Sequence, residues 1–254
     1  MAALDSCCHW SVVIRTAIVV AVLIPPSSAF AQRAVVGQQL ARSKKLYTSP
    51  ESWRARRTEL REEFLKVAWL WPLPDRTPLQ AIVHSRRVHD GYTVENVALE
   101  TMPGFYCTGN LYRPLRQEKP GPGILCPHGH FRPLGRFRAS QQIRCAHFAR
   151  MGATVFSYSM VGWQDSTQTT HDDPLVLALQ TWNSLRALDY LAGLDGVDPE
   201  RLGMTGASGG GTQTFFLAAL DDRIKACAPL VIVYPWTAPA GCKCEGGLPV
   251  MQAA

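Results

Sequence analysis

A serine set among glycines constrains the fold of this chain more than any other feature. The segment Gly206-Ala207-Ser208-Gly209-Gly210 follows the strand-like run Leu202-Gly203-Met204-Thr205 and precedes a helical pattern over residues 210–220. Glycines on both sides allow a turn too tight for side chains, and such a turn lifts the serine hydroxyl above the edge of a sheet. We therefore expect a sheet in which a strand leads directly into a helix at Ser208.

The chain around this turn alternates between strand-like and helix-like patterns. Segments 92–101 and 105–112 predict an antiparallel strand pair, because the turn Met102-Pro103-Gly104 lies between them. The further predicted strands are 124–126, 153–158, 201–205 and 224–233, and the further predicted helices are 140–151, 175–194 and 210–220. Alternation of this kind predicts an α/β fold with a mostly parallel sheet and helices on both faces.

The first 31 residues differ from the rest of the chain. An apolar run over residues 17–24 follows Arg15 and is ended by prolines, and Ala29-Phe30-Ala31 is a small-x-small arrangement that signal peptidase accepts. The apolar run is too short to span a bilayer comfortably. We therefore expect residues 1–31 to be a cleaved export signal rather than a membrane anchor, and the mature protein to be secreted or periplasmic.

Residues 32–87 are expected to form an N-terminal helical extension, followed by an α/β domain over residues 88–254. Ser49-Pro50-Glu51 offers a helix start, and apolar residues recur at helical spacing from Trp53 to Val67. The arginines of residues 54–61 alternate with glutamates, which is typical of a solvated helix face. The net charge of +6 is otherwise scattered, so no nucleic-acid partner is expected.

Six cysteines remain after the predicted signal. Export would place them in an oxidising compartment, where some could form disulfides. Cys126 and Cys227 lie in apolar strand-like runs, where a buried free thiol is the simpler expectation. Cys242 and Cys244 offer two metal ligands, but no second cysteine or histidine pair stands near them at ligand spacing. No metal site and no cofactor are therefore expected.

Ser208 is the predicted nucleophile. The N-terminus of the following helix supplies unpaired N–H groups that stabilise an oxyanion. A phosphate-binding loop is the alternative, but no lysine follows the glycines and no G-x-G-x-x-G spacing is present.

The segment Cys126-Pro127-His128-Gly129-His130 directly follows a predicted buried strand, where this architecture places a second oxyanion donor. The backbone N–H of Gly129 or His130 would act together with that of Gly209. We expect the His128 and His130 side chains to be structural, with His128 near the pocket; a role as metal ligands or as a general base is the alternative. Asp165, in the loop after the strand ending at residue 158, either lines the pocket or caps a turn.

Several segments resemble a known family when taken together: 110–114, 128–130, 160–166, 197–203, 205–214 and 241–245. They are similar to the acetylxylan-esterase-like branch of the α/β hydrolases, which also includes dienelactone-hydrolase-like relatives. The resemblance covers about residues 88–247. It implies a serine carboxylesterase that forms an acyl-enzyme at Ser208, with small-molecule or carbohydrate esters as substrates and carbohydrate-linked acetyl groups as the expected ones.

The chain departs from this family after Ser208. A triad on such a fold runs serine, acid, histidine in chain order, yet the last histidine here is His171. Glu245 is the candidate acid, with an ordinary loop residue as the alternative reading. The resemblance implies further strands bearing the acid and the histidine, so we expect a truncated gene product with an incomplete sheet. The alternatives are an inactive fragment of such a hydrolase, or a serine peptidase of the prolyl-oligopeptidase kind.

Overall fold

The computed structural model describes residues 38, 41, 48–231 and 242–245 of the 254-residue chain. The chain divides into two compact units, residues 1–55 and 56–254, and the sheet and the candidate site belong to the second. The predicted export signal lies outside the described residues. None of the helices in the described part of the chain has the length and apolar character that crossing a bilayer requires.

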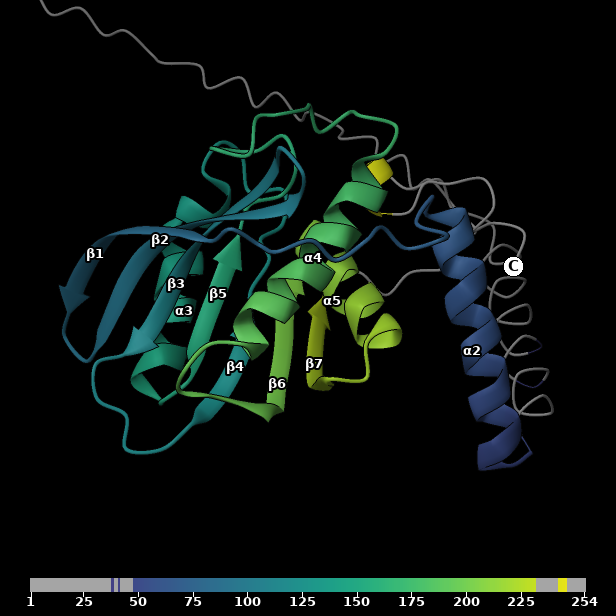
Figure 1. The fold of residues 1–254 in the computed structure, drawn as a ribbon, viewed down its shortest axis with the longest axis horizontal. Helices are drawn as coiled ribbons and strands as arrows, with labels where there is room; N and C mark the ends of the chain where they lie inside the picture. Colours follow the sequence, from purple (N-terminus) through teal and green to yellow (C-terminus); the bar gives the residue numbers. More distant parts are fainter. Residues whose placement is uncertain (1–37, 39–40, 42–47, 232–241, 246–254) are drawn as a thin grey trace, which may run out of the picture. The chain divides into compact units, whose positions relative to one another are not determined.

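A seven-stranded sheet forms the centre of the second unit (Figure 1). Its strands lie in the order β1-β2-β3-β5-β4-β6-β7. The pairs β1–β2, β2–β3 and β3–β5 are antiparallel. The pairs β5–β4, β4–β6 and β6–β7 are parallel. The strands are β1 (Ile82–His89), β2 (Tyr92–Met102), β3 (Phe105–Pro114), β4 (Gly121–Leu125), β5 (Thr154–Tyr158), β6 (Val197–Ala207) and β7 (Ile224–Leu230).

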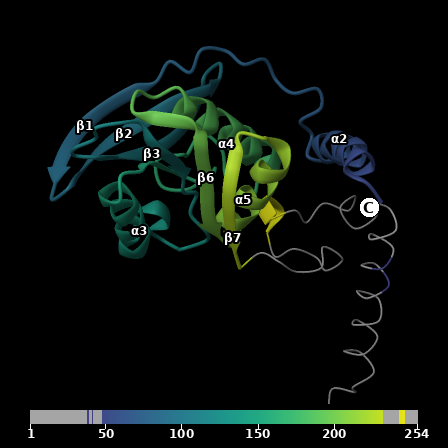
Figure 2. The ribbon, with the colours of Figure 1, turned by 90° about the horizontal axis from the view of Figure 1, so that it is seen from below.

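Helices cover both faces of this sheet, as the alternating pattern predicts. Figure 2 shows α3 (Ala139–Arg150) on the face opposite α4 (Val176–Ala192) and α5 (Gly209–Leu220). Successive strand side chains point to opposite faces, so Val155 packs in the cluster beneath α3 while Phe156 packs in the larger core with α4. The predicted α/β fold, with parallel strands and helices on both faces of the sheet, is confirmed.

The prediction of a helical extension over residues 32–87 is wrong at its end, because the strand β1 begins there and continues to His89. Its sequence, IVHSRRVH, does not alternate between apolar and polar residues, and all eight of its side chains are exposed. An edge strand of this kind depends on backbone pairing with β2 rather than on burial, so a hydrophobic pattern cannot reveal it. The helix α2 (Pro50–Val67) forms where residues 49–67 predict it. The predicted residues 232–233 of the last strand lie outside the described residues.

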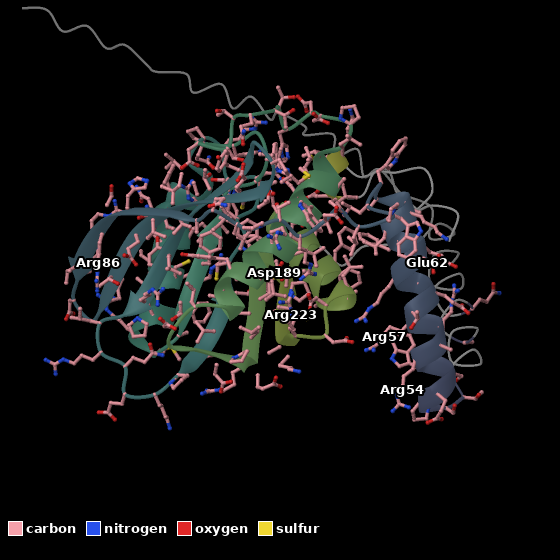
Figure 3. The ribbon with its side chains drawn as sticks, viewed as in Figure 1. Arg54, Arg57, Glu62, Arg86, Asp189 and Arg223 are labelled. Carbon is pink, nitrogen blue, oxygen red and sulfur yellow. The ribbon has the colours of Figure 1, made fainter. Side chains whose placement is uncertain are left out.

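An ion network ties α4 to the turn before β7. The carboxylate of Asp189, on α4, accepts a hydrogen bond of 2.8 Å from Arg223, and both residues are labelled in Figure 3. It also accepts a hydrogen bond of 2.6 Å from Arg186. Arg76 reaches the same carboxylate at 2.7 Å. The Arg186 side chain is 5% exposed, so its charge depends on this partner.

The basic face of α2 is only partly a solvated surface. Arg56 pairs with Glu59 and Glu63 on the same helix, as the alternating charges predict. Arg57 and Arg61 instead both reach Asp222, in the turn that follows α5. Two of the basic residues therefore make tertiary contacts that the local charge pattern does not reveal.

Candidate active site

Ser208 occupies a strained turn between β6 and α5. Its backbone angles are φ 54° and ψ −124°, a conformation that costs a non-glycine residue about 1–3 kcal/mol. The glycines permit the turn, since a Cβ at Gly206 would lie 2.5 Å from the carbonyl oxygen of Gly210. A Cβ at Gly210 would lie 2.5 Å from the carbonyl oxygen of Pro127. The sharp strand–turn–helix bend predicted from the glycines is thus present at Ser208.

Two side chains meet the hydroxyl of Ser208. The hydroxyl donates a hydrogen bond of 2.6 Å to Oε1 of Glu245. The Nδ1 atom of His130 lies 3.2 Å from Oγ and 3.3 Å from the same carboxylate oxygen. Glu245, the candidate acid, therefore lies in direct contact with the serine. His130 contacts Ser208 through its side chain, whereas the sequence pointed mainly to its backbone N–H.

Electrostatics favour opposite charges on these two side chains. Hydrogen bonds with Cys242 and then with Glu245 raise the pKa of His130 to about 9. The pKa of Glu245 is lowered, chiefly by the hydrogen bond from His130, against the opposing effect of burial. An imidazolium–carboxylate pair beside the serine hydroxyl is the expected state at neutral pH.

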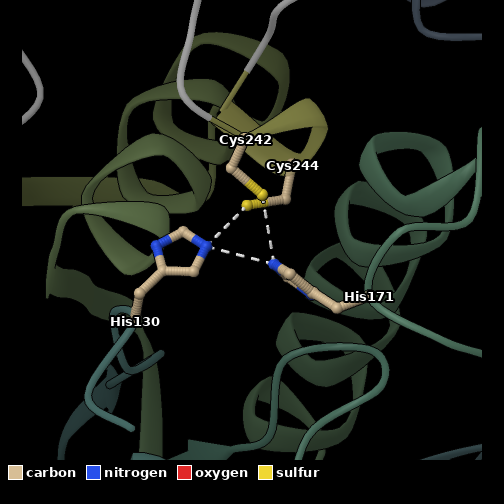
Figure 4. A group of neighbouring side chains, drawn as sticks. All are labelled: His130, His171, Cys242 and Cys244. Carbon is tan, nitrogen blue, oxygen red and sulfur yellow. Dashed lines mark hydrogen bonds between the residues drawn. The ribbon is translucent and has the colours of Figure 1, made fainter.

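A second group of side chains lies on the far edge of the His130 ring. We call it the His–Cys cluster, and it consists of His130, His171, Cys242 and Cys244 (Figure 4). The hydrogen bond between the two cysteines lowers the pKa of Cys242 and raises that of Cys244. The sequence analysis considered Cys242 and Cys244 as two metal ligands but expected no metal site, because no second pair lies near them along the chain. The two histidines come from distant segments, so the sequence did not reveal this cluster.

His128 is a buried support rather than an exposed pocket wall. Its side chain is completely buried, and its Nε2 atom accepts a hydrogen bond of 3.0 Å from the N–H of Met160. Its Nδ1 atom therefore has the proton and donates to the carbonyl oxygen of Gly129 at 2.8 Å. Burial lowers the pKa of His128 to about 4, so the ring is neutral at physiological pH. The residue holds the loop after β4 against the end of β5.

The backbone of this loop lies against the serine turn. A Cβ at Gly129 would be 3.1 Å from Cβ of Ser208 and 2.3 Å from the carbonyl oxygen of Ala207. Gly209 is the first residue of α5, so its N–H has no partner within the helix. The segments expected to donate to an oxyanion thus lie beside Ser208. Their catalytic role stays a prediction.

Asp165 serves a different buried group. Its carboxylate accepts hydrogen bonds from two nitrogens of Arg136, at 2.8 and 2.6 Å, and from the hydroxyl of Thr108 at 2.6 Å. The Arg136 side chain is only 2% exposed. Of the two roles considered for Asp165, pocket wall or turn anchor, these bonds favour the anchor.

Comparisons with known proteins identify relatives of this chain among hydrolases. Residues 180–238, which contain β6, Ser208, α5 and β7, match the family model of acetyl xylan esterase (AXE1). Among proteins of known sequence, YtaP of Bacillus subtilis strain 168, which has a provisional hydrolase name, is 26% identical over 193 residues. That alignment covers 68% of this chain and 64% of YtaP.

Two solved structures illustrate the structural similarity. The methylesterase BT1017 superposes with a TM-score of 0.73 and 38% identity, over 84% of this chain and 49% of its own length. A Bacteroides fragilis protein with a provisional acetyl xylan esterase name gives a TM-score of 0.60 at 17% identity, over 72% and 54% of the two chains. This chain thus spans about half the length of these solved relatives. The chain has the α/β-hydrolase fold, and the predicted resemblance to the acetyl-xylan-esterase-like branch is confirmed.

Proposed function

We propose that this protein is a serine carboxylic ester hydrolase with Ser208 as its nucleophile. The main support is the strained turn at Ser208, whose hydroxyl donates a 2.6 Å hydrogen bond to the carboxylate of Glu245. A serine in such a turn is a poor nucleophile until a base accepts its proton. Glu245 is ionised, is in contact and is therefore the proton acceptor in this proposal.

The proposed reaction has two steps. Oγ of Ser208 attacks the ester carbonyl carbon as its proton moves to Glu245, and the N–H groups of Gly209 and of the Gly129 loop stabilise the resulting oxyanion. Collapse of the intermediate breaks the ester bond, and the departing alkoxide takes the proton back. Water then attacks the acyl-enzyme along the same route and releases the acid. His130 donates from Nδ1 toward both oxygens and holds the carboxylate in place.

The proposed substrates are esters attached to carbohydrates. The match to the acetyl xylan esterase family supports an acetyl group on a sugar hydroxyl. The relative of 38% identity is named a methylesterase, which supports a methyl ester as the second candidate. Comparing acetate release from acetylated xylan with methanol release from methyl-esterified sugar acids distinguishes the two.

We also propose that the protein is exported, on the basis of the signal-like segment Arg15–Ala31. Fractionation of expressing bacteria, followed by N-terminal sequencing, tests this. A mature chain that starts at Gln32 in the periplasm or medium supports export, and a cytoplasmic chain that keeps its first residues contradicts it.

Turnover of p-nitrophenyl acetate by the wild type and by Ser208→Ala tests the central proposal. The substitution removes the nucleophile and is expected to lower kcat by on the order of 10³-fold or more. Glu245→Gln keeps the shape of the side chain but removes the base, and should lower kcat by roughly 10²-fold.

The exposed Ser140 provides the matched control, because Ser140→Ala removes a hydroxyl from α3 without touching the site. Its rate should equal that of the wild type. Equal rates for wild type and Ser208→Ala would reject the esterase proposal for these 254 residues and favour an inactive fragment.

A further inference from the structure

The His–Cys cluster brings four potential metal ligands to one point. One ligand atom from each of its four residues lies within 4.8 Å of all the others. The two Nε2 atoms of His130 and His171 are 3.1 Å apart. Sγ of Cys242 lies 3.3 Å from Nε2 of His171, and Sγ of Cys244 lies 3.2 Å from Nε2 of His130 (Figure 4).

The hydrogen bonds of the two imidazole rings occupy their Nδ1 atoms and leave their Nε2 atoms facing each other. Nδ1 of His171 lies 2.7 Å from the carbonyl oxygen of Val161, which can only accept, so the proton of this ring is on Nδ1. Nδ1 of His130 faces the carboxylate of Glu245 and the oxygen of Ser208, whose own proton is donated to that carboxylate. With these protons on Nδ1, the Nε2 atoms of the two rings face one centre and lie 3.1 Å apart. Each can offer a lone pair to a metal ion, which displaces any proton held there.

The distances fit a small tetrahedral cation. With bonds of about 2.0–2.1 Å to nitrogen and about 2.3 Å to sulfur, a tetrahedral zinc site has nitrogen–nitrogen edges of about 3.3 Å and nitrogen–sulfur edges of about 3.5 Å. The three edges measured here, 3.1, 3.3 and 3.2 Å, are each within a few tenths of an ångström of those values. We propose that the His–Cys cluster binds one Zn²⁺ ion through these four side chains.

The surroundings are those of a metal site. The Val161 carbonyl on Nδ1 of His171 and the Glu245 carboxylate on Nδ1 of His130 are the kind of outer partners that fix the orientation of ligand rings. Trp163 packs edge-on against both imidazoles, with ring centroids 5.9 and 5.8 Å away. Cys244 is completely buried within an apolar cluster that includes Trp163. Thiolate and imidazole together suit zinc rather than calcium or magnesium.

Zinc at this position would join three separate segments. The loop after β4 supplies His130, the loop between β5 and α4 supplies His171, and the 3₁₀ turn η2 (Lys243–Glu245) with its preceding residue supplies both cysteines. Glu245 directly follows a ligand, so the ion fixes the segment that holds this carboxylate against Ser208. This last consequence rests on the proposed esterase function, whereas the binding of zinc does not.

Metal content provides a test independent of catalysis. Metal is removed from the reduced 254-residue chain with a chelator, and the chain is then dialysed against Zn²⁺. Its metal content is measured by inductively coupled plasma mass spectrometry. About one zinc ion per chain is expected, together with a rise in Tm on adding zinc. Loading with Co²⁺ should produce the visible bands of a tetrahedral ion and a near-ultraviolet thiolate band.

Matched variants distinguish zinc bound by the His–Cys cluster from zinc bound elsewhere on the chain. His171→Ala and Cys242→Ser should each lose the stoichiometric zinc and the cobalt bands. His147→Ala and Cys227→Ser remove an exposed histidine and an exposed cysteine elsewhere and should keep both. Ser208→Ala should also keep its zinc, so loss of esterase activity and loss of metal are distinguishable.

Three results would overturn the proposal. They are a wild type that retains no more zinc than His171→Ala, a reduced chain whose Tm does not respond to zinc, and control variants that lose the metal as the cluster variants do. A disulfide between Cys242 and Cys244 that reforms in the presence of zinc would overturn it equally.

Discussion

Two buried polar groups in this protein differ in how their hydrogen bonds are completed. Around Arg136 each of the three guanidinium nitrogens donates to an oxygen, and the acceptors are the side chains of Asn110, Ser159 and Asp165. In the His–Cys cluster the two ring nitrogens and two sulfurs instead point at one another. The first group satisfies its charge within the chain, whereas the second brings four potential metal ligands to one point.

The difference separates a group that supports the fold from one suited to binding or chemistry. A buried cation with a full set of partners stabilises one arrangement of the loop around Asp165, and removing any partner leaves a charge or a polar atom unsatisfied. A set of converging ligand atoms is suited to binding a cation, and we expect it to stabilise the fold less than the hydrogen bonds of Arg136 do. The three predictions below test this contrast through the free energy of unfolding.

Arg136→Met should give the largest loss of stability. The substitution removes four hydrogen bonds and leaves the acceptors of Asn110 and Asp165 without their buried donor, so the free energy of unfolding should fall by about 3 kcal/mol. Urea unfolding at neutral pH measures the change. Arg116→Met, at an exposed position, is the control and should change the stability by less than about 0.5 kcal/mol. A loss at Arg136 no larger than that of the control would contradict the structural role.

Asp165→Asn should have a smaller effect that depends on pH. The pKa of Asp165 is lowered: burial alone would raise it, but the hydrogen bonds and charge of Arg136 outweigh burial. Because the pKa of Asp165 is lower in the folded chain, its carboxylate stabilises the fold at pH values above the ordinary pKa of 3.8. This stabilisation is lost as the pH falls through the folded-state pKa. Because the carboxylate is half exposed, we expect a loss of only about 1 kcal/mol at neutral pH.

Unfolding curves of wild type and Asp165→Asn at neutral pH and at about pH 3 provide the measurement. The difference in the free energy of unfolding between the two proteins should be smaller at the lower pH, where protonation weakens the ion pair of the wild type. A difference in the free energy of unfolding that stays constant or grows on acidification would show that the charge of Asp165 is not what stabilises the loop.

Cys244→Ala in the presence of a chelator should have the smallest effect. Without a metal ion the sulfur makes only weak thiol contacts, with His130 at 3.2 Å and with Cys242, so its removal should cost about 1 kcal/mol or less. Urea unfolding of both proteins in the chelator provides the comparison. A loss as large as that of Arg136→Met would mean that the cluster stabilises the fold by itself, and the contrast between the two groups would fail.

Much of the fold was predictable because its signals are local. The turn at Ser208 follows from the steric demands of adjacent glycines, and the helices around residues 140–151 and 175–194 follow from amphipathic periodicity. The strand β1 could not be predicted this way, since its exposed residues have no periodic pattern. Its position is fixed by main-chain pairing with β2, which depends little on the pattern of side chains.

The site was predictable only in part. Ser208 and the candidate acid Glu245 could be identified from residue type and from resemblance, and they meet at 2.6 Å. The contact of the His130 side chain with the serine could not, because it depends on how β4 and β6 lie side by side in the sheet.

The sequence by itself determined the class of the fold and the position of the sharp bend, because glycine sterics and side-chain periodicity act over a few neighbouring residues. Only the tertiary structure decided that His130 meets His171 across 41 residues and Cys244 across 114. The order of the strands sets these encounters, since parallel strands bring the loops at their carboxyl ends to one edge of the sheet. The ligand set of the proposed zinc site therefore exists only in the folded chain.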